Sequence, residues 1–155
     1  MRKKGLCVIS ALLEMFIYPT EDKEKALAAL IKLVPQEVRD RLLIERTSFK
    51  SHYGYSLEKA TIKLSDKEAA AFAKYLEELL DDSSVMKINQ TLETRTDDRN
   101  LYLRVSKQEA YEGRIRLYDK DPGGQIRIRI TYSSSYLPKG GLVRAIREKG
   151  IGISE

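Results

Sequence analysis

The first long apolar run of the chain reads Gly5-Leu6-Cys7-Val8-Ile9-Ser10-Ala11-Leu12-Leu13-Glu14-Met15-Phe16-Ile17-Tyr18. Basic residues precede it, as in a signal peptide, but Glu14 interrupts the run and no small-residue cleavage site follows. The run is also shorter than the about 20 apolar residues that cross a bilayer. Because strands buried on both faces are nearly continuous in apolar residues, residues 5–18 predict a long strand inside a sheet.

Two amphipathic helices are expected to cover one face of that sheet. Glu21–Val34 has an apolar stripe and acidic residues in its first turn, and Thr20 is its candidate N-cap. Asp66–Leu80 follows Ser65, which begins a capping-box pattern. We therefore expect an α+β fold, with a mainly antiparallel sheet of about four to six strands and helices packed on one face.

Further segments have the alternation or β-branched content of strands, with turn residues between them. They are Leu43–Leu64 with an interruption at Ser51–Ser56, Leu101–Val105, Arg114–Tyr118 and Ile126–Tyr132. The last two flank the turn Asp121-Pro122-Gly123-Gly124 and predict a β-hairpin. Residues 1–155 are expected to form a single domain, with residues 133–155 as a C-terminal extension that contains a short helix at Leu142–Lys149.

Positive charge is concentrated in the last third of the chain. The formal net charge is +5, and residues 100–150 hold eleven Lys or Arg against five Asp or Glu. Such an excess favours a polyanion such as RNA, DNA or an acidic membrane surface. One cysteine and one histidine cannot form an internal disulfide, a Cys-based zinc site or a multi-histidine site. We expect a cytoplasmic protein without a metal or cofactor.

The predicted hairpin supplies the first candidate site. Alternation places Arg114, Arg116, Arg127 and Arg129 together on one face of the sheet. Planar guanidinium groups suit phosphate oxygens, so this face is a candidate contact surface for a nucleic-acid backbone. The alternative is a solvated sheet face whose charge is balanced by carboxylates elsewhere.

The loop Lys50-Ser51-His52-Tyr53-Gly54-Tyr55 is the second candidate site. A cation, an imidazole and two phenol rings suit stacking on exposed bases beside a phosphate contact. A structural turn anchored by its tyrosines is the alternative. His52 lacks the nearby nucleophile and orienting acid that a catalytic base requires.

Motifs for catalysis are absent from the sequence. It contains no Walker-type phosphate loop, no strand–GxGxxG–helix element, no nucleophile elbow and no paired zinc-ligand spacing. Asp81-Asp82 and Asp97-Asp98 are interpreted as solvated helix-end and turn residues, and Cys7 as a small core residue. The sequence therefore predicts a protein that is not an enzyme.

Three motifs follow one another along the chain. They are Pro19-Thr20-Glu21-Asp22-Lys23-Glu24-Lys25, His52-Tyr53-Gly54 and Leu101-Tyr102-Leu103-Arg104-Val105-Ser106-Lys107-Gln108-Glu109-Ala110-Tyr111-Glu112-Gly113. In these motifs the chain resembles an archaeal family described as exosome-associated RNA-binding proteins, over roughly residues 5–132. Ser106 stands where the family pattern tends to have Asp, and Tyr55 where it tends to have Asn. The resemblance implies RNA binding and a fold like that of the ribosomal protein that binds 5S rRNA, which has been likened to double-stranded-RNA-binding domains.

These observations lead to the hypothesis of a non-catalytic RNA-binding protein that assists RNA processing, the exosome or ribosome biogenesis. RNA and RNA-processing proteins are the expected partners. Binding to a membrane is not expected. Phosphate contacts are expected from the arginine face and from Arg104 and Lys107 at the start of a short helix. Base or ribose contacts are expected from His52, Tyr53 and Tyr55. The alternatives are a protein-interaction adaptor that uses the basic hairpin face, and an enzyme of unknown type.

Overall fold

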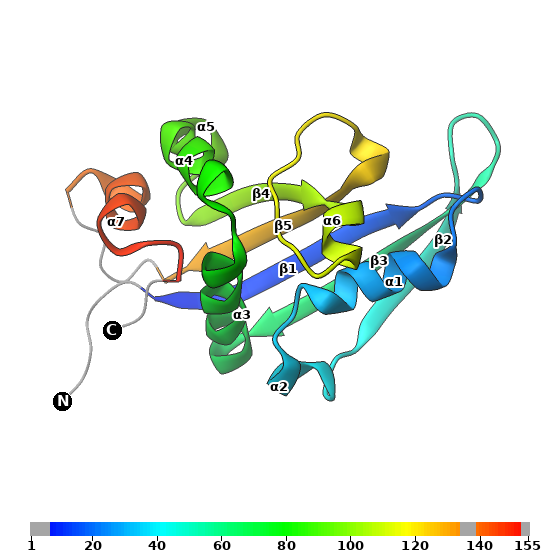
Figure 1. The fold of residues 1–155 in the computed structure, drawn as a ribbon, viewed down its shortest axis with the longest axis horizontal. Helices are drawn as coiled ribbons and strands as arrows, with labels where there is room; N and C mark the ends of the chain where they lie inside the picture. Colours follow the sequence, from blue (N-terminus) through cyan, green and yellow to red (C-terminus); the bar gives the residue numbers. More distant parts are fainter. Residues whose placement is uncertain (1–6, 134–138, 153–155) are drawn as a thin grey trace.

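The protein consists of one antiparallel sheet and a layer of helices (Figure 1). The structure, a computed structural model, describes residues 7–133 and 139–152. The strands are β1 (Val8–Ile17), β2 (Ile44–Lys50), β3 (Ser56–Ser65), β4 (Asn100–Ser106) and β5 (Gln125–Tyr132). The helices are α1 (Lys23–Lys32), α2 (Gln36–Arg39), α3 (Asp66–Leu79), α4 (Asp82–Gln90), α5 (Leu92–Arg95), α6 (Lys107–Tyr111) and α7 (Gly141–Lys149), with a short 3-10 turn at Pro122–Gly124.

The strands lie in the order β2-β3-β1-β5-β4, and every neighbouring pair is antiparallel. β1 is the central strand, hydrogen-bonded to β3 on one side and to β5 on the other. Its side chains Ala11, Leu13 and Met15 are buried in the core. The prediction of a long strand inside the sheet is confirmed, and so is the α+β fold with helices on one face.

In the part of the chain that the structure describes, helices cover only one face of the sheet. α3 crosses β1 and β3, and α1 lies over β1 with α6 beside it (Figure 1). Side chains that point toward these helices, such as Ile62 and Ile128, are almost fully buried. Successive side chains of a strand point to opposite faces, so their neighbours Lys63 and Arg129 point away from the helices. The uncovered face therefore carries polar and charged groups.

The helix starts differ in detail from the expected caps. The N-cap of α1 is Asp22 rather than Thr20, because the Asp22 carboxylate accepts two first-turn amide hydrogen bonds, of 3.0 and 3.3 Å. Ser65 makes no side-chain capping bond, and the chain turns from β3 into α3 with a φ of 52° at Asp66. Ser106 does cap α6, accepting a 3.0 Å bond from an amide three residues later.

The interrupted β segment at residues 43–64 is a hairpin made of β2 and β3. The Ser51 amide donates to the Tyr55 carbonyl at 2.8 Å, and Gly54 has a φ of 90° at the tip. Helices α4 and α5 were not expected from the sequence. α4 has little apolar content, and among its residues Ser84 and Ile88 are the buried ones.

The hairpin expected from residues 114–132 does not form. β5 pairs with β1 on one side and with β4 on the other, so no place remains beside it for Arg114–Tyr118. That segment runs instead along the outer edge of β4, where Leu117 and Val105 form an isolated bridge. Ile115 is buried and bridges to Leu80. The alternation of this segment therefore reflects burial against the helix layer and not pairing with β5.

Within residues 7–133 and 139–152, no helix is both long enough and apolar enough to cross a bilayer. The same residues contain no cluster of three or more His, Cys, Asp or Glu side chains that could hold a metal ion. Cys7 lies just before β1 and is half-buried rather than a core residue, with its thiol 3.9 Å from the hydroxyl of Ser133.

Candidate nucleic-acid interface

The uncovered side of the sheet, here called the open face, collects the side chains that alternate away from the helices. Three rows across the strands are Glu45, Thr61, Glu14, Arg127 and Arg104; Lys63, Leu12, Arg129 and Tyr102; and Thr47, Lys59 and Phe16. Phe49 stands one row beyond Thr47 on β2 and contacts the ring of Phe16. Three predicted site residues, Arg104, Arg127 and Arg129, therefore meet on this surface. They come from two strands that are adjacent in the sheet.

Two arginines stand directly opposite each other on the open face. Arg104 of β4 and Arg127 of β5 are register partners, and like charges at such positions destabilise a sheet. Arg127 is compensated by an ion pair of 3.2 Å with Glu14, and its guanidinium lies 5.2 Å from the ring centroid of Phe16. Arg129, one row away, forms no ion pair with any residue that the structure describes. The face thus holds positive charge that its own carboxylates do not balance.

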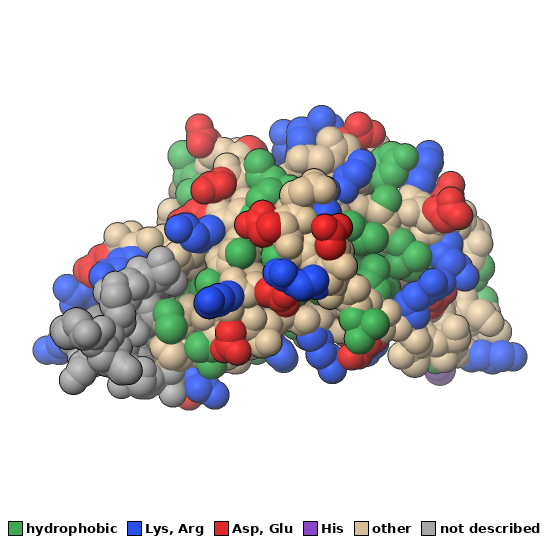
Figure 2. Space-filling model, turned by 90° about the horizontal axis from the view of Figure 1, so that it is seen from below, with side chains coloured by type: hydrophobic (Ala, Val, Ile, Leu, Met, Phe, Trp, Pro, Cys, Tyr) green, Lys and Arg blue, Asp and Glu red, His purple; other side chains and the backbone are tan. Residues whose placement is uncertain are grey.

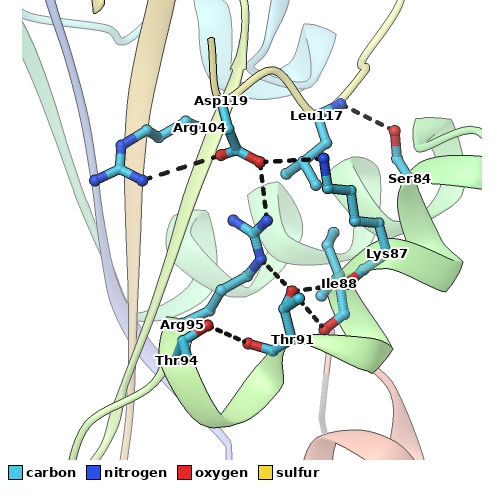
Figure 3. A network of polar contacts seen from close by, with 9 residues as sticks. All are labelled: Ser84, Lys87, Ile88, Thr91, Thr94, Arg95, Arg104, Leu117 and Asp119. Carbon is cyan, nitrogen blue, oxygen red and sulfur yellow. Dashed lines mark hydrogen bonds and ion pairs between the residues drawn. The ribbon is translucent and has the colours of Figure 1, made fainter.

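Arg104 reaches toward an acidic side chain at the rim of the open face (Figure 3). Asp119 bonds Arg95 at 3.0 Å and lies 3.7 Å from the Lys87 ammonium, whereas the guanidinium of Arg104 is 4.0 Å away. Burial opposes ionisation of Asp119, but the Arg95 hydrogen bond and the neighbouring positive charges outweigh it and hold the pKa of that carboxyl below its usual value. Because the shorter contacts go to Arg95 and Lys87, Arg104 is only loosely paired.

A small hollow opens on this face between β1, β5 and β4. Its volume is about 270 Å³, and the open-face side chains that line it are Leu12, Glu14, Tyr102, Arg104, Arg127 and Arg129. The hydroxyl of Tyr102 donates a 2.8 Å hydrogen bond to Asp97, while the residue remains 43% exposed. This bond raises the pKa of the Tyr102 hydroxyl and lowers the pKa of the Asp97 carboxyl. The Tyr102 ring is therefore held in place at the wall of the hollow.

The predicted loop site forms the tip of the β2–β3 hairpin, which projects beyond the end of the sheet (Figure 1). Tyr53 is 84% exposed, and its ring contacts that of His52 edge-on at a centroid distance of 5.4 Å. Tyr55 is partly exposed, and Lys50 is exposed at the end of β2. The ring of Phe49 packs against that of Phe16 on the open face, with a distance of 5.8 Å between the ring centroids. The tip therefore continues from the end of the open face.

Lys107 lies inside the protein and not on its surface. Its side chain is 9% exposed, and its ammonium donates to the Phe16 carbonyl at 2.9 Å and pairs with Glu21 at 2.8 Å. This corrects the expectation of an exposed cation at the start of α6, because Lys107 already has two protein partners.

Arg114 and Arg116 lie at the edge of β4 beside α6, away from the open face. Arg114 bonds Glu109 at 2.6 Å, and Arg116 lies 4.0 Å from Glu109 and 3.8 Å from Asp81. Arg116 borders a groove of about 800 Å³ whose lining mixes acidic and basic side chains. The expected surface of four arginines is therefore divided, and only the pair on β5 belongs to the open face.

Charge type alone does not outline this site. Figure 2 shows basic and acidic side chains interspersed over the side of the molecule seen from below. Sequence reasoning missed Phe16, Lys59, Lys63 and Tyr102 as members of the open face. Alternation along β3 and β4 could have revealed Lys59, Lys63 and Tyr102. Each of them lies between two buried residues of its strand, so its side chain points to the opposite face.

Comparison with known proteins gives related chains of similar length. A family described as RNA binding matches residues 10–132. RNA-binding protein PAB1135 of Pyrococcus abyssi is 29% identical over 138 residues, which are 86% of this chain and 87% of that protein. Uncharacterized protein MJ0213 of Methanocaldococcus jannaschii is 28% identical over 112 residues, 70% of this chain and 75% of that one. The crystal structure of protein AF2318 from Archaeoglobus fulgidus has a TM-score of 0.76 and 28% identity, covering 91% of this chain and 98% of that chain.

Proposed function

This chain belongs to the family described as RNA binding, and we propose that it binds RNA through the open face and the tip of the β2–β3 hairpin. The observation that carries the proposal is the register pair of Arg104 and Arg127, with Arg129 beside it. Guanidinium groups at opposed positions repel each other. A phosphate held over the outer ends of these guanidinium groups would offset that repulsion and accept their planar donors.

The remaining charges of the open face favour the same kind of ligand. Lys59 and Lys63 add two cations, while Glu14 and Glu45 are the carboxylates among its members. Contacts from such long basic side chains to phosphates are independent of base sequence and sensitive to salt. In this proposal Lys50 also contacts phosphate.

The exposed rings of the hairpin tip are proposed to contact bases or riboses. Aromatic surface is presented next to the Lys50 cation by His52, Tyr53 and Tyr55. Stacking of a base on an aromatic ring tolerates any base. Lys107, Arg114 and Arg116 are left out of the proposed interface, because Lys107 is buried and the two arginines lie beside α6, away from the open face.

We propose that the binding is non-catalytic and that residues 1–155 act as a single domain. The proposed setting is RNA processing in the cytoplasm, as an accessory to the exosome or to ribosome biogenesis, with RNA-processing proteins as further partners. Support for this setting comes from the resemblance to exosome-associated proteins, and support for RNA as the ligand comes also from the name of the Pyrococcus abyssi relative.

Charge reversal on the two sides of the sheet tests the proposal. Arg129→Glu is expected to weaken RNA binding about tenfold or more, because one charge-assisted contact to phosphate becomes a repulsion. Lys67→Glu changes the net charge equally in the first turn of α3, on the helix side, and is the matched control. Fluorescence anisotropy with a labelled RNA measures both. Equal affinities for the two variants would contradict an interface on the open face.

A further inference from the structure

The hollow between β1, β5 and β4 has the shape and chemistry to receive one nucleobase. Its side chains occupy two rows on three adjacent strands, with Leu12, Arg129 and Tyr102 in one row and Glu14, Arg127 and Arg104 in the other. Strands lie about 4.8 Å apart and every second residue about 6.8 Å apart, so the enclosed area is only about 10 by 7 Å. The volume of about 270 Å³ lies just below that of pockets for drug-sized ligands.

The carboxylate in the hollow argues against a phosphate there. Glu14 is about four-fifths buried and would repel an anion that entered beside it. One of its oxygens accepts a 3.2 Å hydrogen bond from Arg127, and the other forms an ion pair with Lys59 at 3.2 Å. A carboxylate has about four lone-pair positions, so it can also accept an N–H donor from the edge of a base. A base in the hollow would leave its own phosphates outside, within reach of the long side chains of Arg129 and Arg104 that line it.

The aromatic wall of the hollow is fixed before any ligand arrives. The hydrogen bond from Tyr102 to Asp97 anchors the far end of the ring, and Asp97 is itself held by bonds of 2.9 and 3.1 Å from the side chain and amide of Asn100. Leu12 adds an aliphatic surface in the same row. An ordered ring that loses little freedom on binding is a favourable stacking platform.

We infer that this hollow binds an unpaired nucleobase, with Tyr102 as the stacking residue and Glu14 as the acceptor for a base N–H, so that the protein prefers single-stranded RNA to duplex RNA. This inference rests on the proposed function and specifies the substrate class of the same face. In an A-form duplex the base edges are paired and the bases are stacked on their neighbours. Only an unpaired nucleotide can place its base in the hollow.

A tryptophan reporter tests the inference directly, because the chain contains no tryptophan. In Tyr102→Trp, saturable fluorescence quenching is expected with an unstructured single-stranded RNA and not with a duplex of the same sequence. Tyr75→Trp is the matched control, since Tyr75 lies in the helix layer with its hydroxyl 3.4 Å from the Lys32 carbonyl. Quenching is not expected there. Binding of the single strand without quenching at position 102 would overturn the inference.

Affinities of two further variants give a readout that does not depend on fluorescence. Tyr102→Ala is expected to weaken single-strand binding about 5- to 150-fold and to leave duplex binding unchanged. Tyr102→Leu keeps an apolar side chain for folding but lacks the aromatic ring. It should also weaken binding of the single strand and leave duplex binding unchanged. Wild-type affinity for the single strand in both variants would overturn the base site while leaving the proposed function intact. If Arg129→Glu binds as the wild type does, the open face itself is wrong and both proposals fail.

Discussion

Lys107 is a cation that holds elements of the fold together. It joins the start of α6 to the Phe16 carbonyl of β1 and to Glu21 before α1. Lys107→Ala leaves both acceptors without this partner, so it is expected to lower the free energy of unfolding by about 1–3 kcal/mol. Urea denaturation measures the change, and Lys67→Ala, on an exposed position, should stay within about 0.5 kcal/mol. A variant that is as stable as the wild type but binds RNA less tightly would contradict the structural role.

Asp119 links stability to pH. Its pKa is held below the unfolded value of about 3.9, so the ionised carboxylate stabilises the fold above that pH, and this contribution is lost as the pH falls through the folded pKa. Asp119→Asn is therefore expected to be less stable than the wild type near neutral pH, with the difference shrinking below about pH 4. Thermal melts across this range test it, with the exposed Asp98→Asn as control. A difference that stays constant with pH would show that ionisation is not involved.

Among the elements, the β2–β3 hairpin depends on one backbone conformation at its tip. Gly54 has a φ of 90°, and a Cβ placed there would meet no atom within 4 Å. Gly54→Ala is therefore expected to cost about 1–2 kcal/mol through backbone strain alone. Gly54→Asn should cost less, because Asn tolerates the left-handed region better. Urea denaturation of both variants decides the point, and equal costs would mean that strain at this residue is not the cause.

The elements that the sequence predicts well are those whose signals are local. The apolar run of β1 and the stripe of α3 are visible in single segments, and both elements form where expected. Strand pairing is a long-range property, and alternation at Ile126–Tyr132 shows which side chains face outward but not which strand lies alongside. The similar alternation around Ile115 arises from burial next to Leu80. α4 escaped notice because its single buried hydrophobic residue makes no stripe.

For the candidate site too, the sequence predicts what depends on local patterns and misses what depends on long-range contacts. Alternation identified Arg127 and Arg129 as outward-facing residues of one strand. Their meeting with Arg104 depends on the register of β4 against β5, which no local pattern contains. The burial of Lys107 also could not be foreseen, because its partner Glu21 lies 86 positions away in the sequence.

Across the whole molecule, cations and carboxylates are paired on many surfaces, and the open face is a place where part of the positive charge stays uncompensated. Arg114, Arg116 and Arg147 each have a carboxylate within 4.0 Å, whereas Arg129 has none among the described residues. The net charge of +5 therefore says less about the interface than the location of the unpaired groups does. Local excess, and not total charge, should govern how tightly RNA is held.

The salt dependence of RNA binding should report this local excess. Each neutralised phosphate contributes about 0.7–0.9 to the slope of log affinity against log salt, and about three to five contacts are expected from the open face and the tip. Arg127→Glu combined with Arg129→Glu removes two outward-facing cations, so it should lower the slope by about 1–2 while the fold is retained. Lys107→Ala should leave the slope unchanged, because its ammonium binds Glu21 and not RNA. Anisotropy titrations at several salt concentrations compare the three proteins, with melting curves to verify folding. A wild-type slope near zero would reject electrostatic binding by this face and would favour the reading of the protein as an adaptor for other proteins.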